Sequence, residues 1–203
     1  MKTDRNRMNK EIYTWANIPS RAQGLFLDTL QPYPGHEQEQ ENLRRGLKAL
    51  LDGKFWCLKI FGSVGNGKTM YASAAVMYYN VERQWCGAKY ITQDALANEL
   101  YGSFDNDSRT SESKVVKHYS NLPFLVIDEI SDKDKNWREY VKEKLERIIA
   151  ARYERNLPTV LAGNITQSRF ENKVEEYITS RCNEGKLVYM TGNDIRKEKN
   201  NGK

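Results

Sequence analysis

GSVGNGKT at residues 62–69 matches the pattern G-x-x-x-x-G-K-[ST] at every fixed position. The stretch lies between an apolar run at residues 55–61 and a sequence with helical spacing at residues 69–81. Glycines let a chain curl around a triphosphate without a Cβ in the way, so that backbone N–H groups can bind the phosphates. The predicted phosphate-binding residues are Gly62, Ser63, Val64, Gly65, Asn66, Gly67, Lys68 and Thr69.

Two side chains of this loop have separate predicted roles. Lys68 would reach the β- and γ-phosphates of ATP, and Thr69 would offer its hydroxyl to Mg²⁺. The helix that starts near Lys68 would add the positive end of its dipole, which favours an anion. A glycine-rich turn that matches by accident is the alternative, but the flanking strand and helix favour a nucleotide triphosphatase.

Composition narrows the class of protein. The 203 residues, 39% of them hydrophobic, suffice for one α/β domain with a single core. No apolar run is long enough to cross a bilayer, and the N-terminus MKTDRNRMNK has no apolar signal core. Cys57, Cys86 and Cys182 are odd in number and lack Cys-x-x-Cys spacing, so they predict neither a disulfide framework nor a zinc site. We expect a cytoplasmic protein with reduced thiols and no membrane association.

Basic side chains cluster at the two ends of the chain. The net charge is +5, from 32 basic and 27 acidic residues. Such ends often contact phosphate backbones, although simple solubility would explain the same excess. We expect a basic N-terminal arm at residues 1–17, a core domain at residues 18–196 and a basic tail at residues 197–203. Prolines and weak periodicity predict that residues 1–36 lie extended over the domain.

Strand-like and helix-like segments alternate along the core domain. The expected strands are residues 55–61, 88–92, 122–130, 159–162 and 187–190. The expected helices are residues 36–51, 69–81, 93–101, 114–119, 135–155 and 168–177. The polar residues 103–113 are expected to form a surface loop. This alternation predicts an α/β fold, a five-stranded parallel sheet with helices on both faces.

Two acids follow the apolar run at residues 124–127, where the third strand is expected to end. Ligands of such sheets bind at the carboxyl ends of the strands. Asp128 would hold Mg²⁺, mainly through its water shell, and Glu129 would orient the water that attacks the γ-phosphate. A nucleotide kinase has no use for such a water activator, so the pair favours a hydrolase over a kinase. Two acids that cap a turn by chance are the other alternative.

Asn164 and Arg181 complete the predicted catalytic residues. Asn164 follows the next strand, so it would lie beside Glu129 and could hydrogen-bond the attacking water or the γ-phosphate, although asparagine also caps turns. Arg181 comes after the expected helix at residues 168–177 and before the last strand. An arginine there can stabilise transition-state charge on a phosphoryl group, and its supply by a neighbouring subunit would make hydrolysis depend on assembly.

The order of these features resembles that of an AAA+ ATPase. The chain is most similar to the DnaC/DnaI-type helicase loaders and the related IstB-type transposition ATPases. The similarity lies in IPSR at residues 18–21, LDTL at 27–30, FLVIDEI at 124–130 and the segment from Arg147 to Asn164. It covers about residues 18–196, and the combination is more specific than any one segment.

The resemblance implies a P-loop AAA+ core that hydrolyses ATP with Mg²⁺ and assembles into an ATP-dependent oligomer. It further implies binding of single-stranded DNA and of a hexameric replicative helicase. Arg181 would correspond to an arginine finger, and Arg196 resembles a C-terminal arginine near the nucleotide. Only residues 191–203 follow the last strand, so we expect no C-terminal helical lid, as in the loaders.

One departure from the loaders concerns the N-terminus. The loaders usually carry a separate helicase-docking domain, whereas about 17 residues precede Ile18 here. A short basic helix at residues 1–10, a minimal phage or mobile-element version, or a fragment would each account for this difference. The alternatives to a loader are an IstB-like regulator of a transposase on duplex DNA, a small-molecule kinase and a non-hydrolysing module that uses ATP as a clamp.

Overall fold

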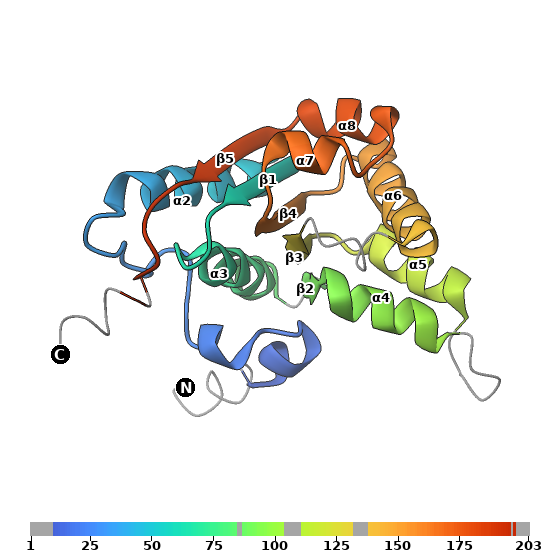
Figure 1. The fold of residues 1–203 in the computed structure, drawn as a ribbon. Coiled ribbons are helices and arrows are strands. Elements are labelled where there is room, and N and C mark those ends of the chain that lie inside the picture. Colours follow the sequence, from blue (N-terminus) through green and yellow to red (C-terminus); the bar gives the residue numbers. More distant parts are fainter. Residues whose placement is uncertain (1–9, 85–86, 104–110, 132–137, 196, 198–203) are drawn as a thin grey trace.

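Five parallel strands form the centre of the fold in a computed structural model, which describes residues 10–84, 87–103, 111–131, 138–195 and 197 (Figure 1). The strands lie in the order β2-β3-β4-β1-β5, and every pair is parallel. Their bounds are β1 Cys57–Gly62, β2 Lys89–Thr92, β3 Leu125–Ser131, β4 Thr159–Asn164 and β5 Lys186–Met190. The central strands are buried on both faces and therefore have continuous apolar sequences rather than alternating ones. The predicted α/β class and five-stranded parallel sheet are confirmed.

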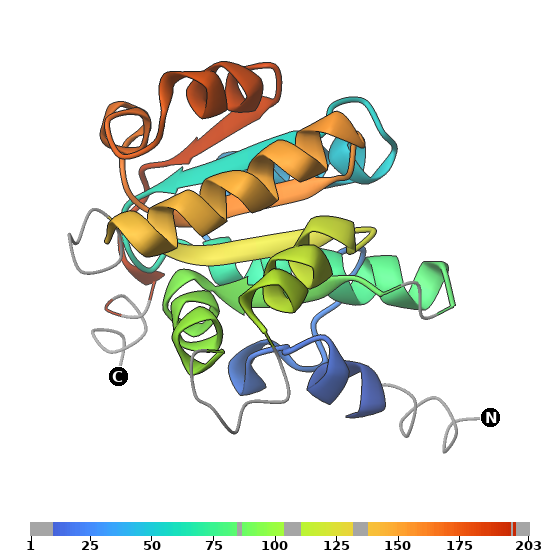
Figure 2. The same cartoon turned by 90° about the vertical axis from the view of Figure 1, so that its right-hand side faces the viewer.

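Helices cover both faces of the sheet, as Figures 1 and 2 show. One face packs against α2 (Glu37–Leu51) and α3 (Lys68–Glu82). The other face packs against α4 Gln93–Gly102, α5 Glu112–Asn121, α6 Glu139–Glu154, α7 Gln167–Glu171 and α8 Glu176–Asn183. Within the described residues, none of the helices combines the length and the apolar character that a membrane span requires.

The N-terminal segment differs from the predicted extended arm. Residues 10–15 are helical, and Ser20–Ala22 form the 3-10 helix η1. Ile12 and Ala16 are one helical spacing apart, and both are buried against the core. The segment also closes one edge of the sheet, because the Ala16 carbonyl oxygen accepts a 2.9 Å hydrogen bond from the backbone N–H of Tyr90 in β2. So short an apolar pattern is too weak for the sequence alone to predict this helix.

A second correction concerns the helix expected at residues 168–177. The structure has two helices there, α7 and α8, and Arg181 lies within α8 rather than after the helix. The start of α8 is fixed by a tertiary contact, because the backbone N–H of its N-cap residue Glu175 donates a 2.8 Å hydrogen bond to the carboxylate of Glu146 on α6. Local helix propensity could not reveal this contact.

Some predictions concern residues outside the described ranges. These are most of the basic arm and tail, the greater part of the surface loop, Cys86 and Arg196. Cys57 and Cys182 are described and are buried free thiols. A hydrogen bond to the Cys182 thiol, together with burial, raises the pKa of the Cys57 thiol well above its usual value, which makes this thiol unreactive at neutral pH.

Arg152 is a fully buried charge that joins α5, α6 and β4. Its guanidinium donates hydrogen bonds to the carbonyl oxygens of Tyr119 (2.9 Å), Leu122 (2.7 Å) and Pro158 (2.8 Å), and to Oγ1 of Thr159 (2.8 Å). Burial lowers the pKa of Arg152 to about 9, so the side chain remains charged at neutral pH. The charge is held by several neutral acceptors at the amino end of β4.

Replacement of Arg152 by alanine should lower the free energy of unfolding by about 3 kcal/mol or more, because several buried acceptors lose their donors and a cavity forms. Urea unfolding followed by circular dichroism measures the change. The matched control is Arg155→Ala, because Arg155 is exposed and makes a single 3.3 Å bond to the Ser120 carbonyl oxygen. This control should change stability by about 0.5 kcal/mol at most. Equal effects of the two substitutions would contradict the role assigned to Arg152.

Candidate active site

A cavity of about 240 Å³ opens at the carboxyl ends of β1, β3 and β4. It collects most of the predicted site residues, together with two side chains from the N-terminal segment that the sequence did not identify. The residues that line it are Arg21, Tyr33, Val64, Gly65, Asn66, Gly67, Lys68, Thr69, Met70, Asp128, Glu129, Gly163, Asn164 and Ile195. Segments far apart in the sequence therefore meet at the edge of the sheet where parallel α/β folds bind ligands.

The loop at residues 62–69 is curled as the motif predicts. Gly65 and Gly67 have φ angles of +83° and +94°, a region that residues with a Cβ rarely adopt. A Cβ at Gly65 would also lie 1.8 Å from Oδ1 of Asp194, so the close approach of the C-terminal segment requires glycine. Helix α3 begins at Lys68, which places the positive end of a 15-residue helix at the cavity.

Lys68 lies inside the curl of the loop with its side chain buried. Its ammonium group donates to the carbonyl oxygens of Gly62 (3.1 Å) and Ser63, and to Oδ1 of Asn66 (3.1 Å). Asn66 is itself fixed, because its Nδ2 donates a 2.9 Å hydrogen bond to the Met190 carbonyl oxygen at the end of β5. A buried cation, a helix N-terminus and a glycine-rich curl form a donor set that fits a polyphosphate.

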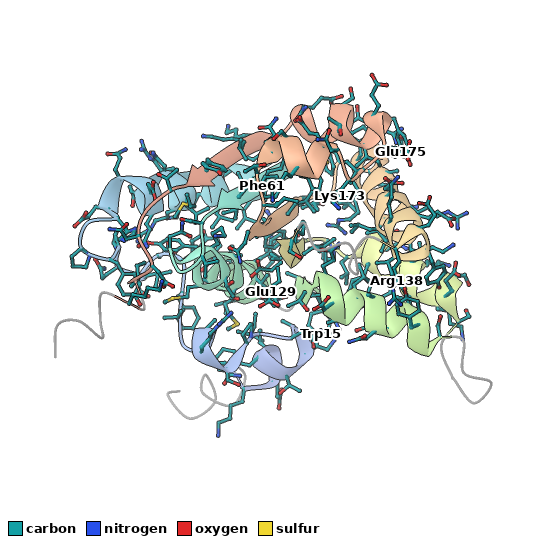
Figure 3. All side chains as sticks on the ribbon, viewed as in Figure 1. Trp15, Phe61, Glu129, Arg138, Lys173 and Glu175 are labelled. Atoms are coloured by element: carbon teal, nitrogen blue, oxygen red, sulfur yellow. The ribbon has the colours of Figure 1, made fainter. Side chains whose placement is uncertain are left out.

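A β-bulge presents the two predicted acids to the cavity. Ile127 pairs with Leu161 and Ile130 with Gly163, so Asp128 and Glu129 together lie opposite a single residue of β4. Glu129 has a φ of +58°, and its side chain is exposed whereas that of Asp128 is buried. Figure 3 shows Glu129 on the side of the sheet that faces the N-terminal segment. Bulges of this kind redirect side chains next to active sites.

Asp128 is held in place by two hydrogen bonds. Its Oδ2 accepts from the Tyr90 hydroxyl at 2.9 Å, and its Oδ1 accepts from the backbone N–H of Glu129 at 2.7 Å. Burial and the adjacent carboxylate raise the pKa of Tyr90, so the phenol remains a donor. The sequence offered no signal for Tyr90 beyond a polar atom in a buried strand. The carboxylate is thus oriented from the neighbouring strand β2, and together with the Thr69 hydroxyl it provides oxygen ligands that fit Mg²⁺.

Asn164 and Arg21 also line the cavity. Asn164 ends β4 opposite Ser131, and its side chain is exposed. Arg21 projects from η1, and its Nη2 lies 3.9 Å from Oε1 of Glu129. Asn164 and Glu129 therefore line the same cavity at one end of the sheet, as predicted. Arg21 from the N-terminal segment also lines this cavity.

Arg181 does not line the cavity. Its Nη2 forms an ion pair with Oε1 of Glu154 at 2.9 Å. The guanidinium carbon lies 5.0 Å from the ring centroid of Tyr153 and 5.1 Å from that of Tyr177. Arg181, the predicted arginine finger, is therefore held on α8 by Glu154 and is not among the residues that line the cavity.

The segment after β5 returns to the phosphate loop. The backbone N–H of Ile195 donates a 3.1 Å hydrogen bond to the Gly65 carbonyl oxygen, and Ile195 lines the cavity. Glu39 on α2 anchors the same segment, because its carboxylate accepts hydrogen bonds from Thr191 and Gly192. Those bonds hold the pKa of Glu39 below its usual value despite its partial burial. Arg196 follows directly but lies outside the described residues.

Comparisons with known proteins agree with this geometry. The family model of the bacterial DnaA ATPase domain matches residues 40–189. No curated protein matches the chain. Among solved structures, a replication initiator DnaA bound to AMPPCP and single-stranded DNA shares 20% identity with a TM-score of 0.65, over 91% of this chain and 56% of that one. The chain thus spans little more than half of that DnaA chain.

Two further structures are similar to the chain. The DnaC helicase loader shares 21% identity with a TM-score of 0.67, over 85% of this chain and 99% of that one. The DnaI structure shares 15% identity with a TM-score of 0.64, over 85% and 94%. These likenesses show a common AAA+ fold, so the predicted DnaC/DnaI-like core is confirmed.

Removal of the Tyr90 hydroxyl should weaken the candidate Mg²⁺ site without unfolding the protein. In Tyr90→Phe the Asp128 carboxylate loses its buried donor, so the Mg²⁺ concentration needed for half-maximal nucleotide binding should rise about 10-fold, as for other residues that orient a metal ligand. A fluorescent nucleotide titrated at several Mg²⁺ concentrations measures this shift. Tyr119→Phe is the matched control, because the Tyr119 hydroxyl also bonds a carboxylate, that of Glu99, but away from the cavity. A shift of the same size in the control would rule out a specific effect at Asp128.

Proposed function

This chain belongs to the bacterial DnaA ATPase-domain family, and on that premise we propose that it binds ATP with Mg²⁺ in the cavity at the ends of β1, β3 and β4 and hydrolyses it. The β-bulge at Asp128 and Glu129 is the observation that carries the proposal, because it presents a buried and an exposed carboxylate to the same cavity as the phosphate loop. A site that only held a nucleotide would need no exposed carboxylate at the position of the attacking water.

Each side chain of the cavity has a separate proposed role. Lys68 would exchange its carbonyl partners for the β- and γ-phosphates, and Thr69 and Asp128 would hold Mg²⁺, which would neutralise charge on the phosphates. Glu129 would orient a water molecule and draw its proton, while Asn164 would hydrogen-bond the same water or the γ-phosphate. The water oxygen bonds to the γ-phosphorus, and the bond from that phosphorus to the bridging oxygen breaks. The products are ADP, phosphate and a proton released to solvent.

The proposed biological role is the loading of a hexameric replicative helicase on single-stranded DNA. The fold shared with the DnaC helicase loader, and with DnaA bound to single-stranded DNA, supports this role. The basic net charge of +5 is compatible with phosphate contacts. An IstB-like ATPase that regulates a transposase on duplex DNA is the second candidate, because it would use the same catalytic residues.

Glu129→Gln should bind ATP normally but hydrolyse it at least about 100-fold more slowly, because the amide cannot accept a proton from the water. Phosphate release measures the rate, and fluorescent ATP measures the affinity. ATP-loaded Glu129→Gln should then retain single-stranded DNA in preference to duplex DNA, and should capture the replicative helicase from a host lysate.

Lys68→Ala is the control for this experiment, because it removes the cation of the phosphate loop and should abolish ATP binding and every ATP-dependent interaction. Unchanged ATP binding in Lys68→Ala would contradict the proposal that residues 62–69 bind the phosphates. Unchanged hydrolysis in Glu129→Gln would contradict the proposal that Glu129 is the general base. Preference for duplex DNA with capture of a transposase would move the protein to the second candidate role.

We further propose that Arg181 acts on the nucleotide of a neighbouring subunit. This role requires Glu154 to release the guanidinium on assembly, because the arginine is now paired with that carboxylate. A partly exposed arginine beside two tyrosines is suited to a protein interface, where arginine and tyrosine are enriched.

Arg181→Ala should leave ATP affinity nearly unchanged and lower turnover by about 10³-fold, which is typical of the loss of an arginine finger. An equimolar mixture of Arg181→Ala and Glu129→Gln should recover part of the activity, because some interfaces then combine an intact Glu129 with an intact Arg181. Arg169→Ala, an exposed arginine on α7, is the control and should behave as the wild type. A mixture as inactive as its components would count against shared sites.

A further inference from the structure

The N-terminal segment contributes a cation to the wall of the cavity. Arg21 lies in η1, where its neighbour Ala22 is buried in the core and its own side chain remains 59% exposed. The Arg21 side chain lines the same cavity as Lys68, Thr69 and Asn164. A basic side chain from outside the phosphate loop thus lines the cavity.

The backbone of this segment is fixed to the site on both sides of Arg21. Before Arg21, the Ala16 carbonyl oxygen accepts a hydrogen bond from Tyr90, the residue whose hydroxyl orients Asp128. After it, the backbone N–H of Tyr33 donates a 2.9 Å hydrogen bond to Oε1 of Gln40. The Nε2 group of that glutamine donates a 3.2 Å hydrogen bond to the carbonyl oxygen of Asn66 in the phosphate loop. Arg21 is therefore carried by a segment that is tied to both halves of the site.

The contact that Arg21 now makes is weak. Its Nη2 lies 3.9 Å from Oε1 of Glu129, and the two side chains are 59% and 53% exposed. Ion pairs between groups as exposed as these contribute little, because solvent screens them. A terminal phosphate carries more charge than a carboxylate and matches the planar guanidinium in geometry. Arg21 can therefore exchange Glu129 for a phosphate within the same cavity.

We propose that Arg21 binds the terminal phosphate of ATP together with Lys68, so that the N-terminal segment distinguishes ATP from ADP. This proposal rests on the proposed binding of ATP in the cavity. When Arg21 binds the phosphate, Glu129 is released and can orient the water. Without that phosphate, Arg21 would pair only with Glu129, whose Oε1 lies 3.9 Å from its Nη2.

The test compares affinities for AMPPCP and ADP in the full chain, measured by calorimetry in the presence of Mg²⁺. Arg21→Ala should weaken AMPPCP binding about 10-fold, the effect of one charge-assisted hydrogen bond, and should leave ADP binding within about 2-fold of the wild type. Arg21→Lys should recover part of the difference, because an ammonium group also attracts phosphate but without the bidentate geometry.

Arg147→Ala is the matched control. Arg147 is 60% exposed and lies 3.7 Å from Glu143, a pair much like that of Arg21 and Glu129 but on α6, and it does not line the cavity. An unchanged ratio of AMPPCP to ADP affinity in Arg21→Ala would overturn the proposal, as would an equal loss of both affinities. A wild-type protein that binds neither nucleotide, or a Lys68→Ala protein that binds both, would instead overturn the proposed function and the role of Arg21 with it.

Discussion

The site depends on the register shift between β3 and β4. Because two residues of β3 lie opposite one residue of β4, Asp128 remains buried against Tyr90 while Glu129 turns outward into the cavity. The shift is possible only where β4 offers no side chain, since a Cβ at Gly163 would lie 1.9 Å from the Ile130 carbonyl oxygen. A regular ladder would send adjacent residues to opposite faces of the sheet, and Glu129 would then point into the helical layer.

The shape of the phosphate loop, which follows β1, depends on contacts with the end of β5 and with α2. The Met190 carbonyl oxygen at the end of β5 accepts a hydrogen bond from Asn66, and Gln40 on α2 donates to the Asn66 carbonyl oxygen. Ile195 then binds the Gly65 carbonyl oxygen. The loop is therefore shaped by hydrogen bonds to segments distant in sequence, which is the kind of preorganisation that lowers the cost of binding.

The sequence predicted those parts of the fold in which local pattern and tertiary structure agree. The spacing of the glycines, the lysine and the threonine at residues 62–69 is specific to phosphate loops. The apolar runs of β1, β3 and β4 are typical of strands buried on both faces. The same reasoning missed Tyr90 and Arg21, because each acts through a residue that is distant in sequence. It also missed that Arg181 lies within a helix, since the start of α8 is anchored by the carboxylate of Glu146, which is distant in sequence. The roles predicted for Asn164, Arg181 and Arg196 remain predictions.

The position of the N-terminal segment has a consequence for the order in which the protein folds during synthesis. Residues 10–36 leave the ribosome before the strands of the sheet, yet Ala16 bonds Tyr90 and Arg21 lies near Glu129, both of which are synthesised later. Strand β1 likewise pairs with β5, which is adjacent in the sheet but is synthesised more than 100 residues later. Contacts between such distant residues slow folding, because a long loop must close before they form. The nascent chain therefore cannot complete its nucleotide site until nearly all of the domain has emerged.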